Sequence, residues 1–307
     1  MAERGKISMP VYQTLMIESK NKMNNMESEI CCAVSCDLPL DKTYWDNQYL
    51  SDQIGWDLGR ISPPIKDYID TIDQKDARIL IPGCGNTYEA VYLLEQGFTN
   101  ITVIDIAPTL IKNLKIQFAE NENITVILGD FFEHNGCYDY IIEQTFFCAL
   151  PPAMRQKYVW KMQQLLVNHG KLFGLLFNRE FEVSPPFGGN LLAYKHLFDH
   201  AFLINSIATA TNSIPARAHT ELFFEFKKNS QIHLNLYHFE GITCSGCSNS
   251  VSNLFLNING VLNVSMNTNF SEIMIVSNTE IEIEVLQNLV LYDTKYKISK
   301  VEKFNLS

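Results

Sequence analysis

The chain has 307 residues and a formal net charge of −10, with 46% hydrophobic and 19% charged residues. This length allows more than one domain, and the hydrophobic content is that of a protein with a substantial core. The acidic balance argues against general nucleic-acid binding, and no apolar run reaches the length of a membrane span. The N-terminus has no apolar signal core, so we expect a cytoplasmic protein without a membrane partner.

The eight cysteines are therefore expected to be thiols or metal ligands rather than disulfides. Residues 1–40 have no sustained hydrophobic period, and we expect them to form a poorly ordered extension. Cys31, Cys32 and Cys36 lie at its end. They are either a soft-metal site or incidental thiols, and the second interpretation is favoured because their spacing matches no standard metal site.

Two tryptophans, Trp45 and Trp56, lie in an aromatic, glycine-punctuated stretch from Tyr44 to Arg60. The stretch is too irregular for one helix. It can form a lid over a bound cofactor, or it can plug the open end of a core. A helix over Ile65–Ile72 is expected to follow it.

A glycine-containing turn, Pro82–Gly85, follows the apolar run Arg78–Ile81, and then come a helix and a second apolar run that ends in Asp105. This order is the first half of a nucleotide-binding α/β fold. Glycines let the backbone approach a ligand, and an acid after the second strand can accept hydrogen bonds from ribose hydroxyls. The full GxGxxG is absent, so NAD is weakly indicated, S-adenosylmethionine is the alternative, and a turn without a ligand stays open.

The alternation of strands and helices continues after Asp105. Strand ends build the crevice of an open α/β sheet, so Asp130 and Phe131 after the third strand can receive an adenine. Arg217 and His219 lie in a polar connection near the end of this region. The expected helices are Leu110–Phe118, Ala153–Leu166 and Leu191–Phe198, and the expected strands are Ile124–Leu128, Tyr138–Ile142, Lys171–Phe177, Phe202–Ala210 and Leu222–Lys227, the last two as an antiparallel pair.

The stretch from Tyr44 to Phe226 resembles the thiopurine S-methyltransferase family, and most closely its plant-type halide and thiol methyltransferase branch. The motifs that carry the resemblance are YWDNQY, GWDLGR, ILIPGCG, DYIIEQTFFCALPP with Arg155, and PPFGG. The resemblance implies an α/β class I S-adenosylmethionine methyltransferase fold, which is a Rossmann-like seven-stranded sheet with an antiparallel hairpin at one edge.

The resemblance also implies site residues. Trp45 and Trp56 would close over S-adenosylmethionine, Gly83 and Asp105 would contact it, and Asp130 would flank its adenine. The predicted cofactor-binding residues are Trp45, Tyr49, Trp56, Gly83, Gly85, Asp105, Ile106, Gly129, Asp130, Phe131 and Gln144. The predicted catalytic residues are Gln144, Phe146 and Arg217.

Methyl transfer to a soft anion needs positioning and desolvation rather than a catalytic triad. Cys84 and Cys148 are therefore interpreted as small packed residues and not as nucleophiles. Relatives often carry Arg or Tyr at the position of Gln144, so the identity of the methyl acceptor stays open.

A second unit begins after Ser230, and its element order is the βαββαβ of a ferredoxin-like sandwich. Its Cys244-Ser245-Gly246-Cys247 stands at a strand-to-helix turn, where a CxxC is a redox pair or a pair of thiolates for a soft metal. The expected strands are Ile232–Phe239, Gly260–Ser265, Glu272–Val276 and Lys297–Phe304, and the expected helices are Ser248–Leu256 and Ile281–Leu291.

The second unit resembles the heavy-metal-associated domain of copper chaperones and metal-transport ATPases, through its GxTCxxC followed by GV-x-x-V. Ile242 replaces the usual Met. The resemblance implies that Cys244 and Cys247 bind Cu(I) or another thiophilic metal ion, with a metal-transfer protein as partner. Two thiolates suit Cu(I) or Hg(II) better than Zn(II).

We therefore expect a poorly ordered extension at 1–40, a methyltransferase domain at 41–228, and a heavy-metal-associated domain at 231–307 that has its own core behind a short polar linker. The first functional hypothesis is an S-adenosylmethionine-dependent methyltransferase acting on a small soft nucleophile (a thiol, a halide or a metalloid oxyanion) and coupled to metal binding in detoxification. The alternative is a metal sensor or carrier whose methyltransferase-like half does not catalyse. Trp45, Asp105 and Asp130 argue against that alternative.

Overall fold

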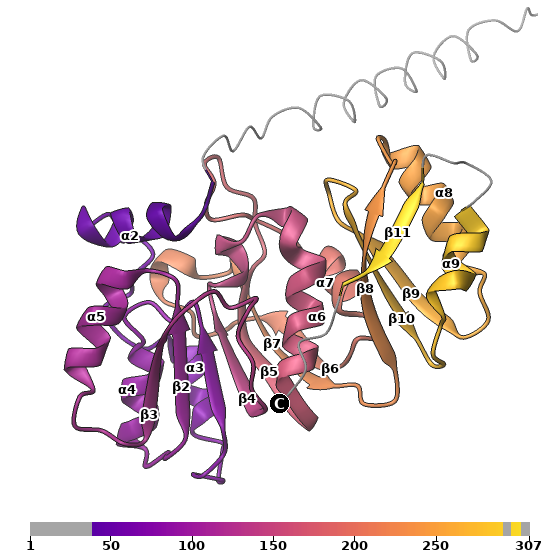
Figure 1. Cartoon of the computed structure of the whole chain (residues 1–307). Coiled ribbons are helices and arrows are strands. Elements are labelled where there is room, and N and C mark those ends of the chain that lie inside the picture. Colours follow the sequence, from indigo (N-terminus) through magenta and orange to yellow (C-terminus); the bar gives the residue numbers. More distant parts are fainter. Residues whose placement is uncertain (1–38, 291–295, 302–307) are drawn as a thin grey trace, which may run out of the picture. The chain divides into compact units, whose positions relative to one another are not determined.

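The computed structural model describes residues 39–290 and 296–301. The predicted N-terminal extension, with Cys31, Cys32 and Cys36, lies outside the described residues. Residues 40–307 form one compact unit that contains a seven-stranded and a four-stranded sheet (Figure 1). In the described part of the chain, no helix has both the length and the apolar character needed to cross a membrane.

The seven-stranded sheet has the strand order β3-β2-β1-β4-β5-β7-β6. Strands β1 to β5 are parallel, whereas β7 pairs antiparallel with both β5 and β6. The predicted class I methyltransferase sheet with an antiparallel pair at one edge is thus confirmed. Its strands are β1 (Ile79–Pro82), β2 (Ile101–Asp105), β3 (Ile124–Leu128), β4 (Tyr138–Gln144), β5 (Leu166–Phe177), β6 (Phe202–Thr209) and β7 (Glu221–Lys228).

Helices cover both faces of this sheet because its central strands are apolar on both sides. In β1, Leu80 joins one buried cluster with residues of α6 and α7, while Ile79 and Ile81 join another with residues of α3, α4 and α5. The helices are α2 (Lys42–Leu50), α3 (Pro63–Ile69), α4 (Tyr88–Glu95), α5 (Pro108–Gln117), α6 (Arg155–Leu165) and α7 (Leu191–Phe198), with short 3₁₀ turns η1 (Phe147–Ala149), η2 (Pro152–Met154) and η3 (Pro215–Arg217).

The aromatic stretch Tyr44–Arg60 does not form one helix, as expected, but its first half belongs to a regular helix, α2. Asp41 caps this helix by accepting a hydrogen bond from the backbone N–H of Tyr44 at 2.9 Å. No residue of α2 is buried, so its sequence carries no apolar stripe that would reveal the helix.

The four-stranded sheet is antiparallel and has the order β11-β8-β10-β9. Helices α8 and α9 share a buried cluster with one face of this sheet, through residues such as Phe239, Val251 and Phe255. The elements are β8 (His233–Glu240), α8 (Ser245–Leu256), β9 (Val261–Met266), β10 (Glu272–Ser277), α9 (Ile283–Val290) and β11 (Lys297–Lys300).

The opposite face of the four-stranded sheet is not free. Leu234, Leu236, Met274 and Val276 on this face belong to the same buried cluster as Trp160 of α6. Helix α6 contacts β8, β10 and β5, and it lies between the two sheets (Figure 1). The second unit therefore has a core of its own and also shares one with the methyltransferase unit, in contrast to the free-standing unit that we expected.

Candidate active site

The glycine turn after β1 is backed by an aromatic ring. Gly83 and Gly85 have φ angles of 53° and 52°, a region that side chains disfavour. A Cβ atom on Gly83 would overlap the ring of Phe146, and one on Gly85 would lie 3.7 Å from the hydroxyl of Tyr49. The structure thus brings four of the predicted site residues to one place, and the close approach of Phe146 requires glycine at position 83.

Asp105 closes this turn from the end of β2. One carboxylate oxygen accepts a hydrogen bond from the backbone N–H of Gly85 at 3.3 Å, and the other accepts one from the N–H of Ala107 at 3.0 Å. Burial raises the pKa of Asp105, while these N–H groups and that of Ile106 lower it. Ile106 is half-buried beside it. The predicted acid is therefore held in a fixed orientation by the turn.

The end of β3 lies next to Asp105, whose carbonyl oxygen accepts a hydrogen bond from the N–H of Gly129 at 3.0 Å. Asp130 is exposed and accepts a hydrogen bond from the N–H of Phe132 at 2.8 Å. Phe131 points into the core instead, where it is 4% exposed and its ring centroid lies 5.2 Å from that of Phe146. Asp130 is thus available to a ligand, whereas Phe131 supports the site from behind.

The predicted aromatic lid forms one cluster of rings. The ring of Trp56 meets those of Trp45 and Tyr49 edge to face, at centroid distances of 5.6 and 5.9 Å. Asp46, which is not among the predicted site residues, accepts a hydrogen bond from the N–H of Thr109 at 2.7 Å. Because Thr109 is in the first turn of α5, the Asp46 carboxylate connects α2 to the N-terminus of α5, which starts three residues after Asp105.

A second unpredicted carboxylate, Asp57, holds the loop that carries Trp56. It accepts hydrogen bonds from the hydroxyl of Tyr88 at 2.9 Å, from the N–H of Gly59 at 2.5 Å and from the side-chain amide of Asn86. Tyr88 and Asn86 belong to the segment in which the glycine turn enters α4. Both carboxylates lie inside the YWDNQY and GWDLGR motifs, which was the only sequence signal for them.

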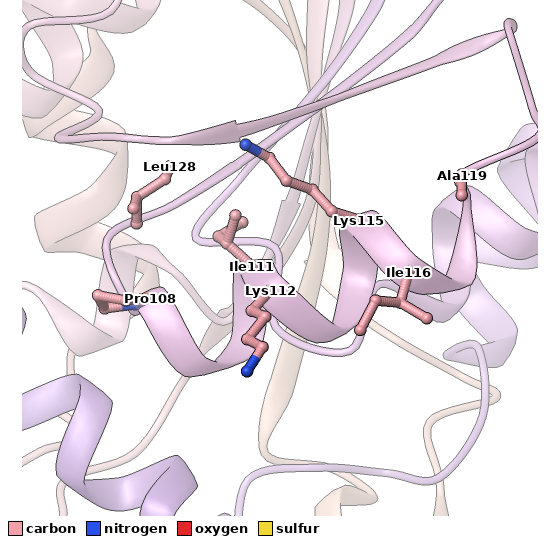
Figure 2. A pocket seen from close by; sticks show the side chains of 7 residues that line it. All are labelled: Pro108, Ile111, Lys112, Lys115, Ile116, Ala119 and Leu128. Atoms are coloured by element: carbon pink, nitrogen blue, oxygen red, sulfur yellow. The ribbon is translucent and has the colours of Figure 1, made fainter.

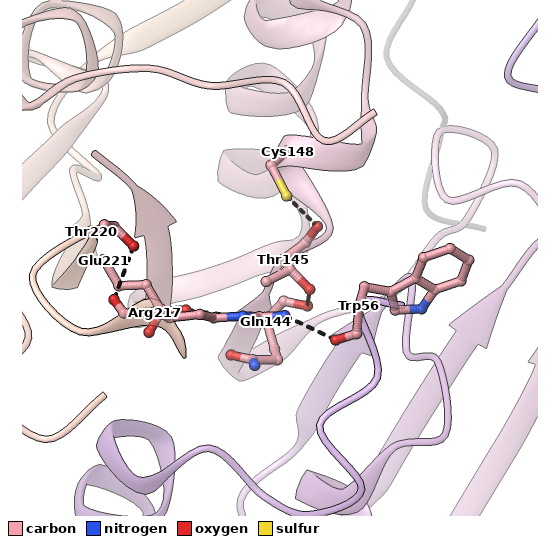
Figure 3. A network of polar contacts seen from close by, with 7 residues as sticks. All are labelled: Trp56, Gln144, Thr145, Cys148, Arg217, Thr220 and Glu221. Carbon is pink, nitrogen blue, oxygen red and sulfur yellow. Dashed lines mark hydrogen bonds and ion pairs between the residues drawn. The ribbon is translucent and has the colours of Figure 1, made fainter. Parts of the chain in front are cut away.

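Arg217 joins the lid loop to the antiparallel edge of the sheet. Its guanidinium donates hydrogen bonds to the carbonyl oxygen of Trp56 at 2.9 Å and to the carboxylate of Glu221 at 3.4 Å. Figure 3 draws Arg217 with its partners Trp56 and Glu221. Of the predicted residues, Arg217 and Trp56 are thus joined directly, and Gln144 ends β4.

Cys148 lies in the same network, where its thiol donates a hydrogen bond to the carbonyl oxygen of Thr145 at 3.0 Å (Figure 3). Burial raises the pKa of this thiol, against the opposing charges of Arg217 and Arg155. Because a thiol with a raised pKa is a poor nucleophile, Cys148 is a packed residue. Cys84 is also buried with a raised pKa, so both cysteines have the environment that was expected for packed thiols.

Arg155, at the start of α6, faces this region with an incomplete set of partners. One terminal nitrogen donates a hydrogen bond to the carbonyl oxygen of Gly188 at 2.6 Å, and the guanidinium carbon lies 5.0 Å from the ring centroid of Phe147. Its Nε is buried without a hydrogen-bond partner. Such an orphaned donor is unfavourable unless a ligand or a water molecule satisfies it.

These positions agree with a comparison to protein families. The model of the thiopurine S-methyltransferase family matches residues 40–227, which is more than half of the chain. This chain belongs to the thiopurine S-methyltransferase family. It is an S-adenosylmethionine-dependent methyltransferase, and the alternative of a purely metal-binding protein is set aside.

Individual members of the thiopurine S-methyltransferase family are similar over most of their own length. A probable thiol methyltransferase 2 of Arabidopsis thaliana is 29% identical over 62% of this chain and 88% of its own, and a thiopurine S-methyltransferase of Acinetobacter baylyi is 28% identical over 52% and 84%. A thiocyanate methyltransferase 1 of Arabidopsis thaliana is 26% identical over 60% and 84%. A solved structure described for the conversion of a disulfide bond into a thioacetal group during echinomycin biosynthesis has a TM-score of 0.51 at 14% identity, over 61% of this chain and 93% of that chain, and shows the fold alone.

The residues of this family member fit S-adenosylmethionine. Two side-chain oxygens at the glycine turn and the end of β4, Thr87 Oγ1 and Gln144 Oε1, are buried without hydrogen-bond partners. They can serve the polar groups of the amino-acid part of the cofactor, while the carboxylate of Asp105 can accept from the ribose hydroxyls.

A shallow hollow of about 520 Å³ lies elsewhere on the methyltransferase unit, against the outer side of α5 (Figure 2). It is lined by the apolar side chains of Pro108, Ile111 and Leu128 and by Lys112 and Lys115, among others. None of the glycine-turn residues lines it, so this hollow is distinct from the predicted cofactor site.

The two cysteines of the second unit lie side by side at the start of α8. Their Sγ atoms are 3.2 Å apart, and the sulfur of Cys244 accepts a hydrogen bond from the N–H of Cys247 at 3.4 Å. Cys244 is exposed and Cys247 is half-buried. Within residues 39–290 and 296–301 there is no group of three or more His, Cys, Asp or Glu side chains that can hold a metal ion.

Proposed function

We propose that this methyltransferase acts on a small soft acceptor that carries negative charge, such as a thiolate, thiocyanate, a halide or a metalloid oxyanion. The observation that carries this proposal is the half-buried Arg155, whose Nε is buried without a partner. Arg217, with a side chain only 12% exposed, lies near the same place, since the positive charges of both guanidinium groups lower the pKa of the Cys148 thiol. Arg217 is paired with Glu221, so Arg155 is the cation that favours an anion at the end of β4.

The chemistry needs little more from the protein. S-adenosylmethionine, when bound, supplies an activated methyl group for in-line displacement by the acceptor. A nearby guanidinium favours the thiolate over the thiol, so no general base is required. Glu143, a buried carboxylate in β4, accepts hydrogen bonds from the N–H of Phe147 and the hydroxyl of Tyr158, so both of its oxygens are already engaged.

The names of the relatives support a sulfur acceptor, since they include thiol, thiocyanate and thiopurine methyltransferases. The test is transfer of a labelled methyl group to hydrosulfide, thiocyanate, iodide, an aromatic thiol and selenite by the full chain. We expect turnover of at least one anionic sulfur acceptor, and a large loss in Arg155→Gln with unchanged cofactor affinity. Full activity of Arg155→Gln, or no transfer to any of these acceptors by a protein that binds S-adenosylmethionine, would overturn the proposal.

The cofactor assignment has its own test. Asp105→Ala removes the carboxylate that is aligned by Gly85 and Ala107, so S-adenosylmethionine should bind about 1–3 kcal/mol more weakly. Asp130→Ala, at the exposed end of the neighbouring strand β3, should weaken S-adenosylmethionine binding by a smaller amount. Calorimetry that finds no loss in Asp105→Ala would contradict the assignment.

The second unit is proposed to be a ferredoxin-like, heavy-metal-associated domain that binds one Cu(I) or another thiophilic ion through Cys244 and Cys247. The βαββαβ order, the 3.2 Å between the two sulfur atoms and the exposure of Cys244 support this. A chain that binds a soft metal and methylates a soft acceptor suits a role in detoxification, with a metal-transfer protein as partner.

Competition with a Cu(I) chelator tests the metal proposal. The full chain should bind one Cu(I), and replacing Cys244 and Cys247 by Ser should abolish binding, because a hydroxyl is a hard and protonated ligand. Cys137→Ser, which changes a half-buried free thiol in the other unit, is the matched control. Equal affinity before and after the double replacement would place the ligands elsewhere.

A further inference from the structure

Helix α6 is enclosed on both sides. Its sequence is polar, yet residues on every side of it are buried, including Gln156, Trp160 and Lys161. A helix buried all round normally lies inside a core. Here the enclosure has two sources, because α6 contacts β5 of the large sheet on one side and β8 and β10 of the small sheet on the other.

The start of α6 is joined to the small sheet by polar contacts. The side-chain amide of Gln156 donates hydrogen bonds to the hydroxyl of Ser265 at 2.9 Å and to the carbonyl oxygen of Met266 at 3.1 Å. Gln156 is 7% exposed and Ser265 is 9% exposed. Hydrogen bonds shielded from water in this way fix orientation more than exposed ones do.

A second contact holds the turn just before α6. The side-chain amide of Asn267, a residue that is 2% exposed, donates a hydrogen bond to the carbonyl oxygen of Ala153 at 3.0 Å. The side-chain oxygen of Asn267 accepts a hydrogen bond from the N–H of Glu272 at 3.0 Å, so Asn267 is itself held by the β9–β10 connection. Arg155 lies between these two anchored residues in the sequence, two positions after Ala153 and next to Gln156.

Arg155 transmits this anchoring to the loop after β5. It donates to the carbonyl oxygen of Gly188, and the N–H of Phe187 in the same loop donates to the carbonyl oxygen of Cys148 at 2.7 Å. The loop thus packs onto the end of β4, where Gln144 and Arg217 lie. If the start of α6 shifts, Arg155 moves with it, and the loop loses the hydrogen bond from Arg155 to Gly188.

We propose that the C-terminal unit is a positioning element of the methyltransferase site. Ser265, the Met266 carbonyl and Asn267 fix the start of α6, and through it the guanidinium of Arg155 and the Phe187–Gly188 loop. The small sheet then completes the acceptor side of the site without touching the acceptor. Its part in catalysis would not depend on whether Cys244 and Cys247 hold a metal.

The full chain offers a matched pair of variants. Gln156→Ala removes both donors to the small sheet next to Arg155. Asn263→Ala, on the same strand β9, removes two donors of the same kind, to the carbonyl oxygens of His196 and Asp199 at 3.2 Å each, but these lie at the end of α7. The two variants therefore lose equivalent contacts across the same interface at different places.

Amide hydrogen exchange of residues 178–190 is the main measurement. Gln156→Ala should accelerate exchange at Phe187 and Gly189 by about tenfold, whereas Asn263→Ala should leave it unchanged. Unchanged exchange in Gln156→Ala, or equal acceleration in Asn263→Ala, would overturn the inference. If Gln156→Ala does not fold, Ser265→Ala removes one acceptor only and must show a smaller acceleration of the same segment.

A kinetic measurement rests on the proposed function and uses hydrosulfide as the acceptor. In Gln156→Ala the KM for hydrosulfide should rise several-fold while the affinity for S-adenosylmethionine stays constant, because Arg155 serves the acceptor side. Gln156→Asn, which keeps a shorter amide, should recover part of the loss, and an unchanged KM would count against the inference. If the unaltered chain does not methylate hydrosulfide, the acceptor proposal loses support, while the exchange experiment still decides the positioning role.

Discussion

Glu143 is a carboxyl group sealed beneath the end of β4. It is 0% exposed, accepts a hydrogen bond from the N–H of Phe147 at 2.9 Å and is paired with the hydroxyl of Tyr158 at 2.5 Å. Burial raises the pKa of Glu143 to about 7, against the opposing effect of these donors. Phe147 begins the turn that leads to Arg155, so the protonation of Glu143 is linked to the support of the acceptor side.

The raised pKa of Glu143 predicts a pH dependence of stability. The native state keeps the proton up to about pH 7, whereas an unfolded glutamate, with the ordinary pKa of 4.5, releases it earlier. The contribution of Glu143 to stability is therefore complete below pH 4.5 and is lost as the pH rises to 7, by up to about 3 kcal/mol. Glu143→Gln should abolish this loss while keeping both hydrogen bonds.

Urea unfolding of the two proteins between pH 4 and 8 measures this difference. The gap in unfolding free energy between Glu143→Gln and the unaltered chain should widen from pH 4.5 to 7 and then stay constant. Glu120→Gln, at an exposed position, is the control and should show no such trend. Parallel curves for Glu143→Gln and the unaltered chain would mean that Glu143 is ionised throughout this range.

Residue positions could be predicted where the pattern is local. Gly85 and Asp105 belong to one strand–turn–helix–strand unit, and the structure places them together as that pattern requires. The function of Asp57 could not be predicted, because its partners Asn86 and Tyr88 lie 29 and 31 residues away in the sequence. Only the folded chain shows which of many carboxylates meets which donor.

At the scale of elements, α2 is the predicted lid, and few side chains hold it. None of its residues is fully buried. Its contacts include the packing of Trp45 and Tyr49 against a buried cluster, the edge-to-face rings of these residues against Trp56, and the hydrogen bond from the Thr109 N–H to Asp46. A carboxylate at a helix N-terminus contributes roughly 1 kcal/mol, which is a large share of the total for such an exposed helix.

We therefore predict that Asp46→Ala loosens the lid without unfolding the protein. S-adenosylmethionine should dissociate about three- to tenfold faster, since roughly 1 kcal/mol of lid docking is lost, while the melting temperature changes little. Asp46→Asn keeps an acceptor for Thr109 and should lie between the two. Asp52→Asn removes an equal charge just after α2, at an exposed position, and is the control. Stopped-flow dissociation rates that are the same in all four proteins would show that Asp46 does not hold the lid.

Element types could be predicted wherever apolar residues follow a clear period, which is the case for the parallel strands and most helices. The start of β5 could not be predicted, because Leu166 pairs with Tyr138 before the register with β4 shifts. The strand therefore runs through Asn168, His169 and Gly170, which interrupt the apolar pattern. The helix expected to reach Leu166 ends at Leu165, and the strand begins at once. Strand irregularities of this kind carry no apolar alternation that a sequence pattern can detect.

At the scale of the whole molecule, the small sheet is apolar on both faces. Leu236 and Met274 point to the cluster shared with α6, while Phe239 and Ile273 point to the cluster under α8 and α9. Apolar residues on both faces signal that both faces are covered, because exposed apolar faces of this size mark interaction sites. Which surface covers the second face could not be predicted, because the sequence of α6 is polar.

The shared face predicts that Leu236→Lys destabilises the full chain but keeps an isolated C-terminal fragment from self-associating. Leu236 is 0% exposed in the full chain, so Leu236→Lys buries an unpaired charge there and should lower the free energy of unfolding by roughly 3 kcal/mol or more. In an isolated fragment of residues 231–307, the face formed by Leu234, Leu236, Met274 and Val276 is exposed. We expect this fragment to self-associate, and Leu236→Lys should make it monomeric, because the charge then lies in water.

Light scattering of the fragment and denaturant unfolding of the full chain measure the two effects. Leu256→Lys is the matched control, since Leu256 on α8 is 42% exposed and should tolerate lysine in both settings. A fragment that is monomeric without any substitution, together with a full chain that tolerates Leu236→Lys, would mean that the two sheets do not share a core. Lower stability of the full chain together with a monomeric fragment is the result expected if the side chain of Leu236 is buried in the full chain and exposed in the fragment.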